Sequence, residues 1–293
     1  DKQALDAIFK TVYEEGVSEG VHNKNPLRDL IKTEKVPFKG LEIQRLMHTS
    51  TNVSPMFVGE DSAFAEAGQQ GYAKFSIDQK KLMSRLRMTW EVMQDSTSSE
   101  GAFVSARKSE MQYLIDDMAR RDEYALSSDG RGVLALIDEA SPNGDTTLEL
   151  DAPGGITNDN FGNRFISAGM FLAFVDPASG AFRSVTDNAK VTAVNSDGTD
   201  VTVDAAANIS STAANSDYVV QAADKDVTSV NDTSYDKAWW GLMALVDDGT
   251  YRSSYFGVTR SDIPAVSSYV ASAVGTLSTD LIQRVSDVVD QKL

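Results

Sequence analysis

The chain of 293 residues contains no cysteine and only two histidines, His22 and His48. The absence of cysteine excludes disulfide bonds, thiolate zinc sites and cysteine nucleophiles. The shortage of histidine removes the side chain on which most acid–base and metal chemistry near neutral pH depends. We therefore expect no catalytic residues, no metal site and no bound cofactor.

Long apolar runs and nucleotide-binding motifs are also missing. No run of 18 apolar residues could span a membrane, and no charged segment followed by an apolar one marks a signal peptide. The sequence has no glycine-rich phosphate loop, no Walker lysine and no dinucleotide fingerprint. Because it begins at Asp1 rather than Met, we expect either processing of the N-terminus or a missing start.

Negative charge is in excess and unevenly distributed. Residues 1–131 hold 18 Lys+Arg against 21 Asp+Glu, and residues 132–293 hold 9 against 22, so the two parts carry −3 and −13 of the total −16. The acidic second part argues against nucleic-acid binding there, whereas the first part could face a phosphate backbone locally. Ordinary solvated surface explains both patterns equally well.

Residues 97–126 predict one uninterrupted helix, the best-defined element of the chain. Thr97, Ser98 and Ser99 are candidate N-caps, and residues 127–130 stop the helix. One face repeats apolar residues at helical spacing, and two neighbours widen it: Val104, Met111, Ile115, Met118 and Ala125, with Tyr113 and Leu114.

The segment before this helix predicts an N-terminal arm and a long β-hairpin. Residues 3–15 have the pattern of a short amphipathic helix, and Pro26 can begin another. From Val36 to Val92 apolar and polar residues alternate, which predicts two long strands joined by the polar tip 59–71. A free hairpin is marginally stable and exposes two edges, so we expect it to bind a partner chain.

The part after the long helix predicts a small β-barrel or sandwich over residues 170–224. Strands are indicated on both sides of the turn 176–180 and at three further segments: 189–195, 199–204 and 217–224. A new core element, expected to be helical, begins at Trp239. A capped amphipathic helix covers residues 277–293.

Three short motifs match functional patterns without their context. Residues 16–20 spell G-x-S-x-G, but the strand before and the helix after a nucleophile elbow are missing. Residues 195–200 suggest a calcium loop, yet Ala193 occupies the first ligand position, so a strand turn explains them better than an adventitious cation. Three glycosylation acceptors matter only in a secreted eukaryotic protein: Asn52, Asn208 and Asn231.

Basic residues cluster only on the long helix and the hairpin stem: Arg107, Lys108, Arg120 and Arg121, with Lys80, Lys81, Arg85 and Arg87. These residues could pair with acidic surfaces of neighbouring chains or face nucleic acid. The alternative is a set of surface ion pairs within the helix, such as Asp117–Arg121.

The order of these elements resembles the major capsid protein of tailed bacteriophages, the Hong Kong 97-type fold. The extended loop and its return strand are similar to VPFKGLEIQRLMHTS and GQQGYAKFSIDQKKLMSRLRMTWEVM, and the spine helix to SSEGAFVSARKSEMQYLIDDMARRDEYALSSDGRGVL. The insertion barrel of some members resembles FLAFVDPASGAFRSV, KVTAVNSDGTDVTVD and DYVVQ. The peripheral-to-axial region resembles GLMALVDDGTYRSSYFGVTRSDIPAV and the last helix.

The resemblance implies an α+β chain with a Hong Kong 97-like fold. Members continue past this last helix, so we expect the chain to be incomplete at its C-terminus. The implied segments are an N-terminal arm, an extended β-hairpin loop, a spine helix with the peripheral domain, a β-rich insertion domain and a peripheral/axial region: 1–35, 36–93, 94–165, 166–230 and 231–293.

The function that the resemblance implies is structural, without enzymatic activity or membrane binding. Copies would form hexamers and pentamers of an icosahedral virion shell, assembled in the host cytoplasm around double-stranded DNA that is bound without sequence specificity. Decoration, portal and scaffolding proteins are the further expected partners, and cleavage of a scaffolding segment would explain the start at Asp1. Some members cross-link lysine to asparagine, and Lys74 is a formal candidate that nothing selects.

The resemblance also implies two sets of site residues. The hairpin would contact other subunits through Glu60, Asp61, Phe64, Glu66, Tyr72 and Lys74. The long helix would direct a basic face to the lumen: Arg107, Lys108, Arg120 and Arg121. We expect a charged residue at position 115 or 118 to block folding, and loss of Arg120 or Arg121 to impair assembly or DNA retention instead.

Other functions remain open from the sequence. An encapsulin-type compartment shell shares the fold and a surface-layer subunit would also self-assemble, although the β insertion and the start at Asp1 favour the bacteriophage. A carboxylate-based hydrolase would need two carboxylates about 5–10 Å apart in a cleft. The chain has many acidic residues but no signature of such a site.

Overall fold

The computed structural model describes residues 26–33, 40, 42–60, 63, 65–87, 100–139, 146–156, 161–183, 188–204, 213–263, 266–270 and 278–292. Within them, the side chains of residues 26, 100–109 and 288–292 are not described. With 25% helix and 27% strand the chain is mixed, which agrees with the α+β class at that level. It divides into two compact units, residues 1–32 with 80–241 (unit 1) and residues 33–79 with 242–293 (unit 2).

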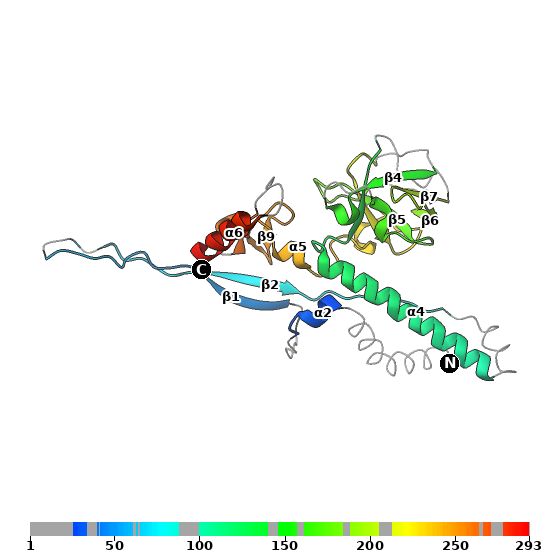
Figure 1. Cartoon of the computed structure of the whole chain (residues 1–293), viewed down its shortest axis with the longest axis horizontal. Coiled ribbons are helices and arrows are strands. Elements are labelled where there is room, and N and C mark those ends of the chain that lie inside the picture. Colours follow the sequence, from blue (N-terminus) through cyan, green and yellow to red (C-terminus); the bar gives the residue numbers. More distant parts are fainter. Residues whose placement is uncertain are drawn as a thin grey trace. The chain divides into compact units, whose positions relative to one another are not determined.

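Unit 1 contains the long helix α4, which runs from Glu100 to Ser127 (Figure 1). The predicted helix is therefore confirmed, while its candidate N-caps lie outside the described residues. At the C-terminal end, the hydroxyls of Ser127 and Ser128 donate to the carbonyls of Tyr124 and Ala125 at 2.9 and 3.0 Å. The Tyr124 carbonyl also accepts the Ser128 amide at 3.0 Å, so the two hydroxyls add hydrogen bonds at the C-terminal end of the helix.

The face of α4 predicted to be apolar is only partly covered in unit 1. Ala119 and Ala125 are buried, but Tyr113, which we expected to widen the face, is 64% exposed. Ile115 and Met118 are half-buried. The buried residues of α4 all lie near its C-terminal end, where the helix packs against the rest of unit 1. The side chain of Val104 is not described.

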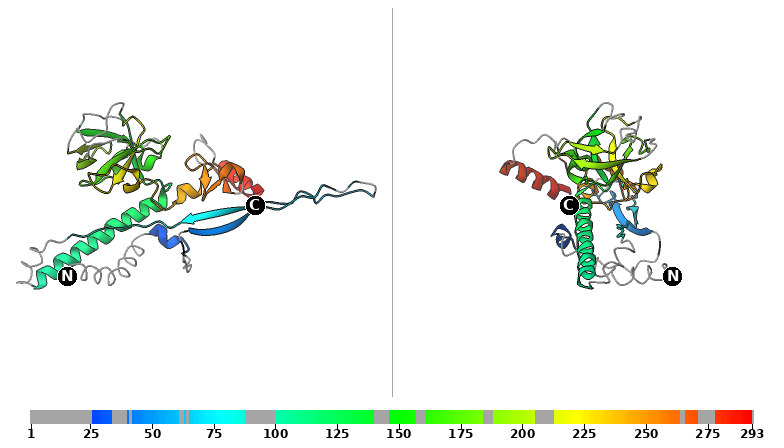
Figure 2. Two further views of the ribbon diagram at one scale, coloured as in Figure 1. Left: turned by 180° about the vertical axis from the view of Figure 1, so that it is seen from behind. Right: turned by 90° about the vertical axis from the view of Figure 1, so that its right-hand side faces the viewer.

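Unit 1 also contains a closed six-stranded antiparallel barrel, with strand order β3-β4-β7-β6-β5-β8. Figure 2 shows this barrel from two further sides. Its strands are β3 (Val133–Ile137), β4 (Thr147–Asp151), β5 (Phe171–Val175), β6 (Ala189–Val194), β7 (Asp200–Val203) and β8 (Tyr218–Ala222). Strands from all parts of the barrel contribute to one apolar core: Leu134, Leu148, Leu172, Phe174, Val191, Val201 and Val219.

The barrel confirms the predicted strands at 189–195, 199–204 and 217–224, but it also includes β3 and β4. It therefore begins at Val133, inside the segment 94–165 that the resemblance assigned to the spine and peripheral domain. After the turn 176–180 the structure has one isolated bridge, between Val175 and Phe182, rather than the expected strand. Residues 195–200 form the turn between β6 and β7, in which the Asp197 amide donates to Asn195 Oδ1 at 3.4 Å.

Both ends of the barrel meet at one place, which we call the neck (residues 131–132 and 234–236). The Asp236 amide donates to the Arg131 carbonyl at 2.7 Å, and the Ser234 hydroxyl donates to the Gly132 carbonyl at 3.0 Å. Gly132 has a φ of 71°, and a Cβ atom there would lie 2.2 Å from the Ser234 carbonyl oxygen. Only glycine permits this close approach without strain.

Unit 2 contains the predicted hairpin, formed by β1 (Glu42–Ser50) and β2 (Gly71–Asp78). The strands pair antiparallel from Glu42 opposite Asp78 to His48 opposite Tyr72. Residues 51–70 connect them, and the two legs of this connection continue side by side beyond the ladder (Figure 1). They approach closely, because a Cβ atom on Gly68 would lie 2.3 Å from Asn52 Oδ1.

The prediction that the return strand continues to Val92 is wrong for residues 79–87, which form no strand. The ladder ends because β1 begins at Glu42, the partner of Asp78 at the last position of β2. Residues 88–92 lie outside the described part of the chain. The stem is held in unit 2 by Phe75, which is buried and packs edge-on against Tyr255 with ring centroids 5.5 Å apart.

The remaining elements of unit 2 are short, apart from the last helix. They are α5 (Leu242–Leu245), β9 (Ser254–Tyr255), β10 (Val258–Thr259) and α6 (Thr279–Lys292). The predicted cap of α6 is confirmed, since Ser278 Oγ accepts the Leu281 amide at 3.2 Å. The core element expected after Trp239 is a single helical turn, and Leu242, Leu245 and Val246 are exposed because α5 is too short to cover a face.

A buried arginine organises this part of unit 2. Arg260 is 1% exposed and donates to the carbonyls of Arg252, Asp247 and Val266 at 2.7–2.9 Å. Its guanidinium also lies 4.0 Å from the carboxylate of buried Asp247. Five N–H donors allow one arginine to satisfy several loop carbonyls at once.

Across the described residues, no helix is long and apolar enough to cross a membrane.

Candidate assembly site

The hairpin of unit 2 presents large apolar side chains to solvent. Val53 is 86% exposed and Phe57 is fully exposed, and Met56 and Val58 beside Phe57 are also exposed. On the paired strands Leu46 and Tyr72 are exposed as well. Exposed apolar side chains therefore follow one another along this segment.

Four of the six hairpin residues predicted to make inter-subunit contacts are described, and all four are exposed. Tyr72 and Lys74 lie on β2, where Tyr72 packs edge-on against His48 at 5.5 Å and Lys74 is opposite Leu46. Glu60 and Glu66 lie in the connecting segment. Among the described residues, no side-chain hydrogen bond or ion pair connects these four residues with one another. Asp61 and Phe64 lie outside the described part of the chain.

The structure differs from the basic face predicted on α4 at one residue, Arg121. Arg120 is exposed and lies 3.8 Å from exposed Asp117, so the ion pair on this helix is Asp117–Arg120 rather than the expected Asp117–Arg121. Arg121 is half-buried and donates to Gln221 Oε1 on β8. The expectation that both arginines are exposed is therefore wrong for Arg121. The side chains of Arg107 and Lys108 are not described.

Arg120 and Arg121 point in different directions because successive residues on a helix are about 100° apart around its axis. Arg121 is the one that points toward the barrel. The guanidinium lies over the ring of Tyr124, 6.0 Å from its centroid. Burial lowers the pKa of Arg121 from its ordinary value. Burial also raises the pKa of Tyr124, and the nearby Asp129 carboxylate adds to that increase.

The basic residues after β2 have mixed surroundings. Lys80 donates to the carbonyl of Asp236 in the neck at 2.8 Å. Lys81, Arg85 and Arg87 are exposed.

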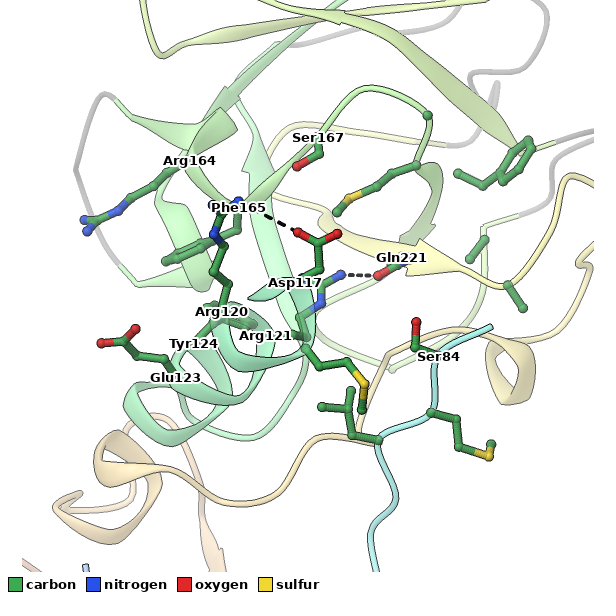
Figure 3. A pocket seen from close by; sticks show the side chains of 18 of the residues that line it. Ser84, Asp117, Arg120, Arg121, Glu123, Tyr124, Arg164, Phe165, Ser167 and Gln221 are labelled. Carbon is green, nitrogen blue, oxygen red and sulfur yellow. Dashed lines mark hydrogen bonds and ion pairs between the residues drawn. The ribbon is translucent and has the colours of Figure 1, made fainter. Parts of the chain in front are cut away.

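A cleft of about 1270 Å³ lies in unit 1 between α4 and the barrel, and we call it the α4–barrel cleft (Figure 3). Its walls come from segments far apart in sequence: Leu27, residues 82–84, residues of α4 between Asp117 and Ser127, residues 164–171 and residues 221–223. Figure 3 shows Arg120 beside Asp117 and Arg121 reaching Gln221 on its wall.

The cleft is lined by polar and apolar groups in equal measure. Five of its residues are charged, three positive and two negative: Arg120, Arg121, Arg164, Asp117 and Glu123. Its apolar lining includes half-buried Met118, Phe165, Met170 and Phe171 and exposed Met83. Among the described lining residues there is no histidine or cysteine.

Tyr124 joins the two walls of the cleft. Its ring packs on Phe165 with centroids 4.3 Å apart, and its hydroxyl donates to the carbonyl of Val133 at the start of the barrel. The buried Asp122 carboxylate, between the lining residues Arg121 and Glu123 in sequence, accepts from Arg28 on α2 (Pro26–Leu30) at 2.6 Å. Arg28 also lies over the ring of Trp239, 5.9 Å from its centroid.

Sequence reasoning missed Arg28, Asp122, Arg164 and Gln221. Arg28 and Arg164 each lie in a single short helical turn, and neither has a sequence pattern that distinguishes it from solvated surface. The one available signal was Asp122, whose position on α4 falls between apolar residues of the expected core face.

No cluster of metal-binding side chains occurs among the residues that the structure describes. The candidate site therefore consists of two surfaces, the exposed hairpin segment and the α4–barrel cleft. In comparisons with protein-family models, curated proteins and solved structures, the chain gives no match.

Proposed function

We propose that this chain is a structural protein that assembles with copies of itself into a closed shell, as the major capsid protein of a tailed double-stranded DNA bacteriophage. The observation that carries this proposal is the hairpin of β1 and β2, whose connecting segment exposes Val53, Met56, Phe57 and Val58. The proposed role is structural rather than catalytic.

The physical argument starts from the two edges of a two-stranded hairpin. Each edge has unpaired backbone donors and acceptors, and such edges bind other chains unless they are covered. Burial of a large apolar side chain is worth about 1.5–3 kcal/mol, so several on one segment supply a strong driving force for association. Regular association of identical chains through such an element produces a closed symmetric assembly when the rotation between neighbours closes on itself.

The order of elements supports the capsid form of this proposal. In a Hong Kong 97-type fold, α4 would be the spine helix, β1 and β2 with residues 51–70 the extended loop, and the barrel the insertion domain. Hexamers and pentamers would assemble in the host cytoplasm and form the virion shell. Scaffolding, portal and decoration proteins are the proposed further partners.

The charge of the barrel region supports loose rather than tight contact with packaged DNA. Residues 132–241 hold 16 Asp+Glu and 5 Lys+Arg, a net charge of −11 out of −16 for the chain. A surface of this charge repels a phosphate backbone. We therefore expect the isolated subunit to bind DNA weakly. A strong affinity that falls steeply with salt concentration would contradict this part of the proposal.

The test is the assembly state of the full chain, measured by sedimentation velocity over a range of concentrations and by negative-stain microscopy. Uniform icosahedral shells that contain DNA after expression are the expected result. Shells that enclose an enzyme instead would indicate a compartment protein of the encapsulin type. A chain that remains monomeric at all concentrations would contradict the proposal.

A further inference from the structure

The stretch of chain after β2, residues 80–87, is strongly basic, and we call it the basic segment. It contains no acidic residue and four basic ones, so it carries +4 in a chain whose total is −16: Lys80, Lys81, Arg85 and Arg87. It forms no helix and no strand, and Figures 1 and 2 show the chain drawn out along α4 at this point. Positive charge is therefore concentrated along one extended stretch of unit 1.

The first part of the basic segment is held against the body of unit 1. Lys80 is half-buried and donates to the Asp236 carbonyl in the neck at 2.8 Å. Leu82 is half-buried as well and lies in the wall of the α4–barrel cleft, opposite residues of α4. These two contacts fix the course of the segment without using its other cations.

The remaining cations form what we call the cation row (Lys81, Arg85 and Arg87). All three side chains are exposed. Alternate residues of an extended chain share one side, so these three odd-numbered positions point the same way. Met83, which lies between them in sequence, is 83% exposed. The row therefore faces solvent over a length of at most about 25 Å, the reach of seven extended residues.

The cation row differs from the described arginines of α4 in its surroundings. Arg120 lies 3.8 Å from Asp117, and Arg121 donates to Gln221. No ion pair connects the cation row with another described residue. Neighbouring like charges repel one another, and an anion with several charges relieves that repulsion. The row is therefore suited to a partner that presents a series of negative charges.

A duplex nucleic acid fits the row better than an acidic protein surface does. A duplex presents one phosphate charge per about 1.7 Å of its axis, so each cation of the row has phosphates within reach. Protein interfaces have an apolar centre from which charged residues are depleted, whereas Met83 is the one apolar side chain between the cations of the row. The basic segment offers no helix or strand pair that could enter a groove and read bases.

We propose that the cation row binds the phosphate backbone of double-stranded DNA without reading its sequence. This inference rests on the proposed function, which supplies the DNA, and it assigns a DNA contact to the basic segment rather than to the arginines of α4. Three phosphate contacts give only weak binding by one subunit, which agrees with the net charge of −11 on residues 132–241. Copies arrayed in a shell add their contacts, because linked sites bind together far more tightly than each alone.

The salt dependence of DNA binding by the full chain tests the number of contacts. A short fluorescent duplex is titrated with the unassembled subunit, and anisotropy reports binding. We expect the logarithm of the affinity to fall against the logarithm of salt concentration with a slope of about −2.7, at 0.9 per phosphate contact. Two duplexes of unrelated sequence should bind equally.

Variants of the cation row locate those contacts. Arg85→Ala and Arg87→Ala should each reduce the slope by about 0.9, and the triple alanine variant of the row should bring it close to zero. Arg284→Ala, at an exposed arginine of α6 outside the basic segment, makes the same change in net charge and should leave the slope unchanged. Because the three side chains are exposed, circular dichroism and thermal unfolding of the variants should match the wild type.

Cross-linking in filled shells tests the location directly. Since the chain has no native cysteine, Met83→Cys gives a single site for a benzophenone label between the cations of the row. Irradiation should link this position to the enclosed DNA. Ser179→Cys, exposed in the turn after β5, is the control and should give no DNA adduct.

The outcomes separate this inference from the proposed function. If the triple variant keeps the wild-type slope, or if position 83 gives no DNA adduct in shells that contain DNA, the inference is wrong and the proposed function stands. If the triple variant keeps the wild-type slope and loses assembly, the row is a contact between copies instead. A wild-type subunit that binds DNA with the expected slope but never forms shells would support the DNA contact and overturn the capsid function.

Discussion

The ion pair between Arg28 and Asp122 fastens α2 to α4. Asp122 is fully buried, whereas the Arg28 side chain is 28% exposed. Because removal of a charged partner exposes a buried carboxylate to an unfavourable environment, we expect Arg28→Ala to lower the free energy of unfolding of unit 1 by about 1–3 kcal/mol. Urea denaturation measures the change.

The matched control is Arg120→Ala on the same helix. Arg120 and Asp117 are 82% and 72% exposed and 3.8 Å apart, and such surface pairs contribute about 0–1 kcal/mol. Equal destabilisation by the two variants would show that the Arg28–Asp122 pair contributes no more to the free energy of unfolding than the exposed Arg120–Asp117 pair.

The Asp151 carboxyl at the end of β4 gives a prediction for pH dependence. Burial raises its pKa, and the nearby Asp138 carboxylate raises it further. The folded chain therefore binds this proton more tightly than the unfolded chain, so its contribution to stability falls as pH rises through the carboxyl range. Asp151→Asn should raise the melting temperature at pH 7 and lose that gain below about pH 3.5, where the wild-type carboxyl is protonated in both states. Thermal unfolding at the two pH values tests this, and a gain that is unchanged at low pH would contradict it.

Arg120 and Arg121 show where residue-level prediction from the sequence ends. The helical repeat correctly indicates that two adjacent residues point in different directions. It does not indicate on which side of α4 the barrel lies, because that depends on the neck between the helix and β3. Arg121 was for this reason assigned to the exposed face, although it binds Gln221 on β8.

Tyr124 connects α4 to the barrel. Its buried hydroxyl donates to the Val133 carbonyl, a bond worth about 0.5–1.5 kcal/mol. Tyr124→Phe should lower the free energy of unfolding by that amount. The same change at Tyr113, which is 64% exposed, should alter it by less than about 0.5 kcal/mol. Similar effects at both positions would argue against a structural role of the Tyr124 bond.

Two phenylalanines separate folding from assembly. Phe174 on β5 is fully buried in the barrel core, and Phe57 in the hairpin segment is fully exposed. Phe174→Ala should destabilise the chain by about 3–5 kcal/mol through the cavity it leaves. Phe57→Ala should leave stability within about 0.5 kcal/mol and reduce assembly, as measured by denaturation and sedimentation together. Normal assembly of Phe57→Ala would weaken the proposed role of the hairpin.

The strands differ in how well the sequence indicated them. β6 and β7 alternate apolar and polar residues on both sides of a short turn, and their prediction is confirmed. In β3 four of the five residues are buried, so no alternation is visible and the segment resembles any apolar run. β4 was missed because its pattern of two buried residues is too short to recognise.

Whole-chain organisation was predicted only in part. The sequence indicated the hairpin, the long helix and the β-rich region, because each depends on a continuous pattern. The α4–barrel cleft could not be predicted, since its lining comes from five places between Leu27 and residue 223. Only the tertiary arrangement brings these residues together.

The barrel should fold without the rest of the chain. Its core is closed on itself, and its two ends are bonded to each other in the neck. A fragment of residues 131–236 should therefore show β-sheet circular dichroism and one cooperative thermal transition. A fragment without a cooperative transition would show that the barrel needs α4 to fold.

The neck also has a consequence for how this gene can change. Arg131 and Asp236 are adjacent in space, so the chain enters and leaves the barrel at one place. Recombination at these two points can exchange the barrel as a cassette, for a longer or a shorter one, without changing the distance between its two ends. Related genes should therefore diverge fastest in this interval, and differences in its length should be tolerated there before they are tolerated in α4.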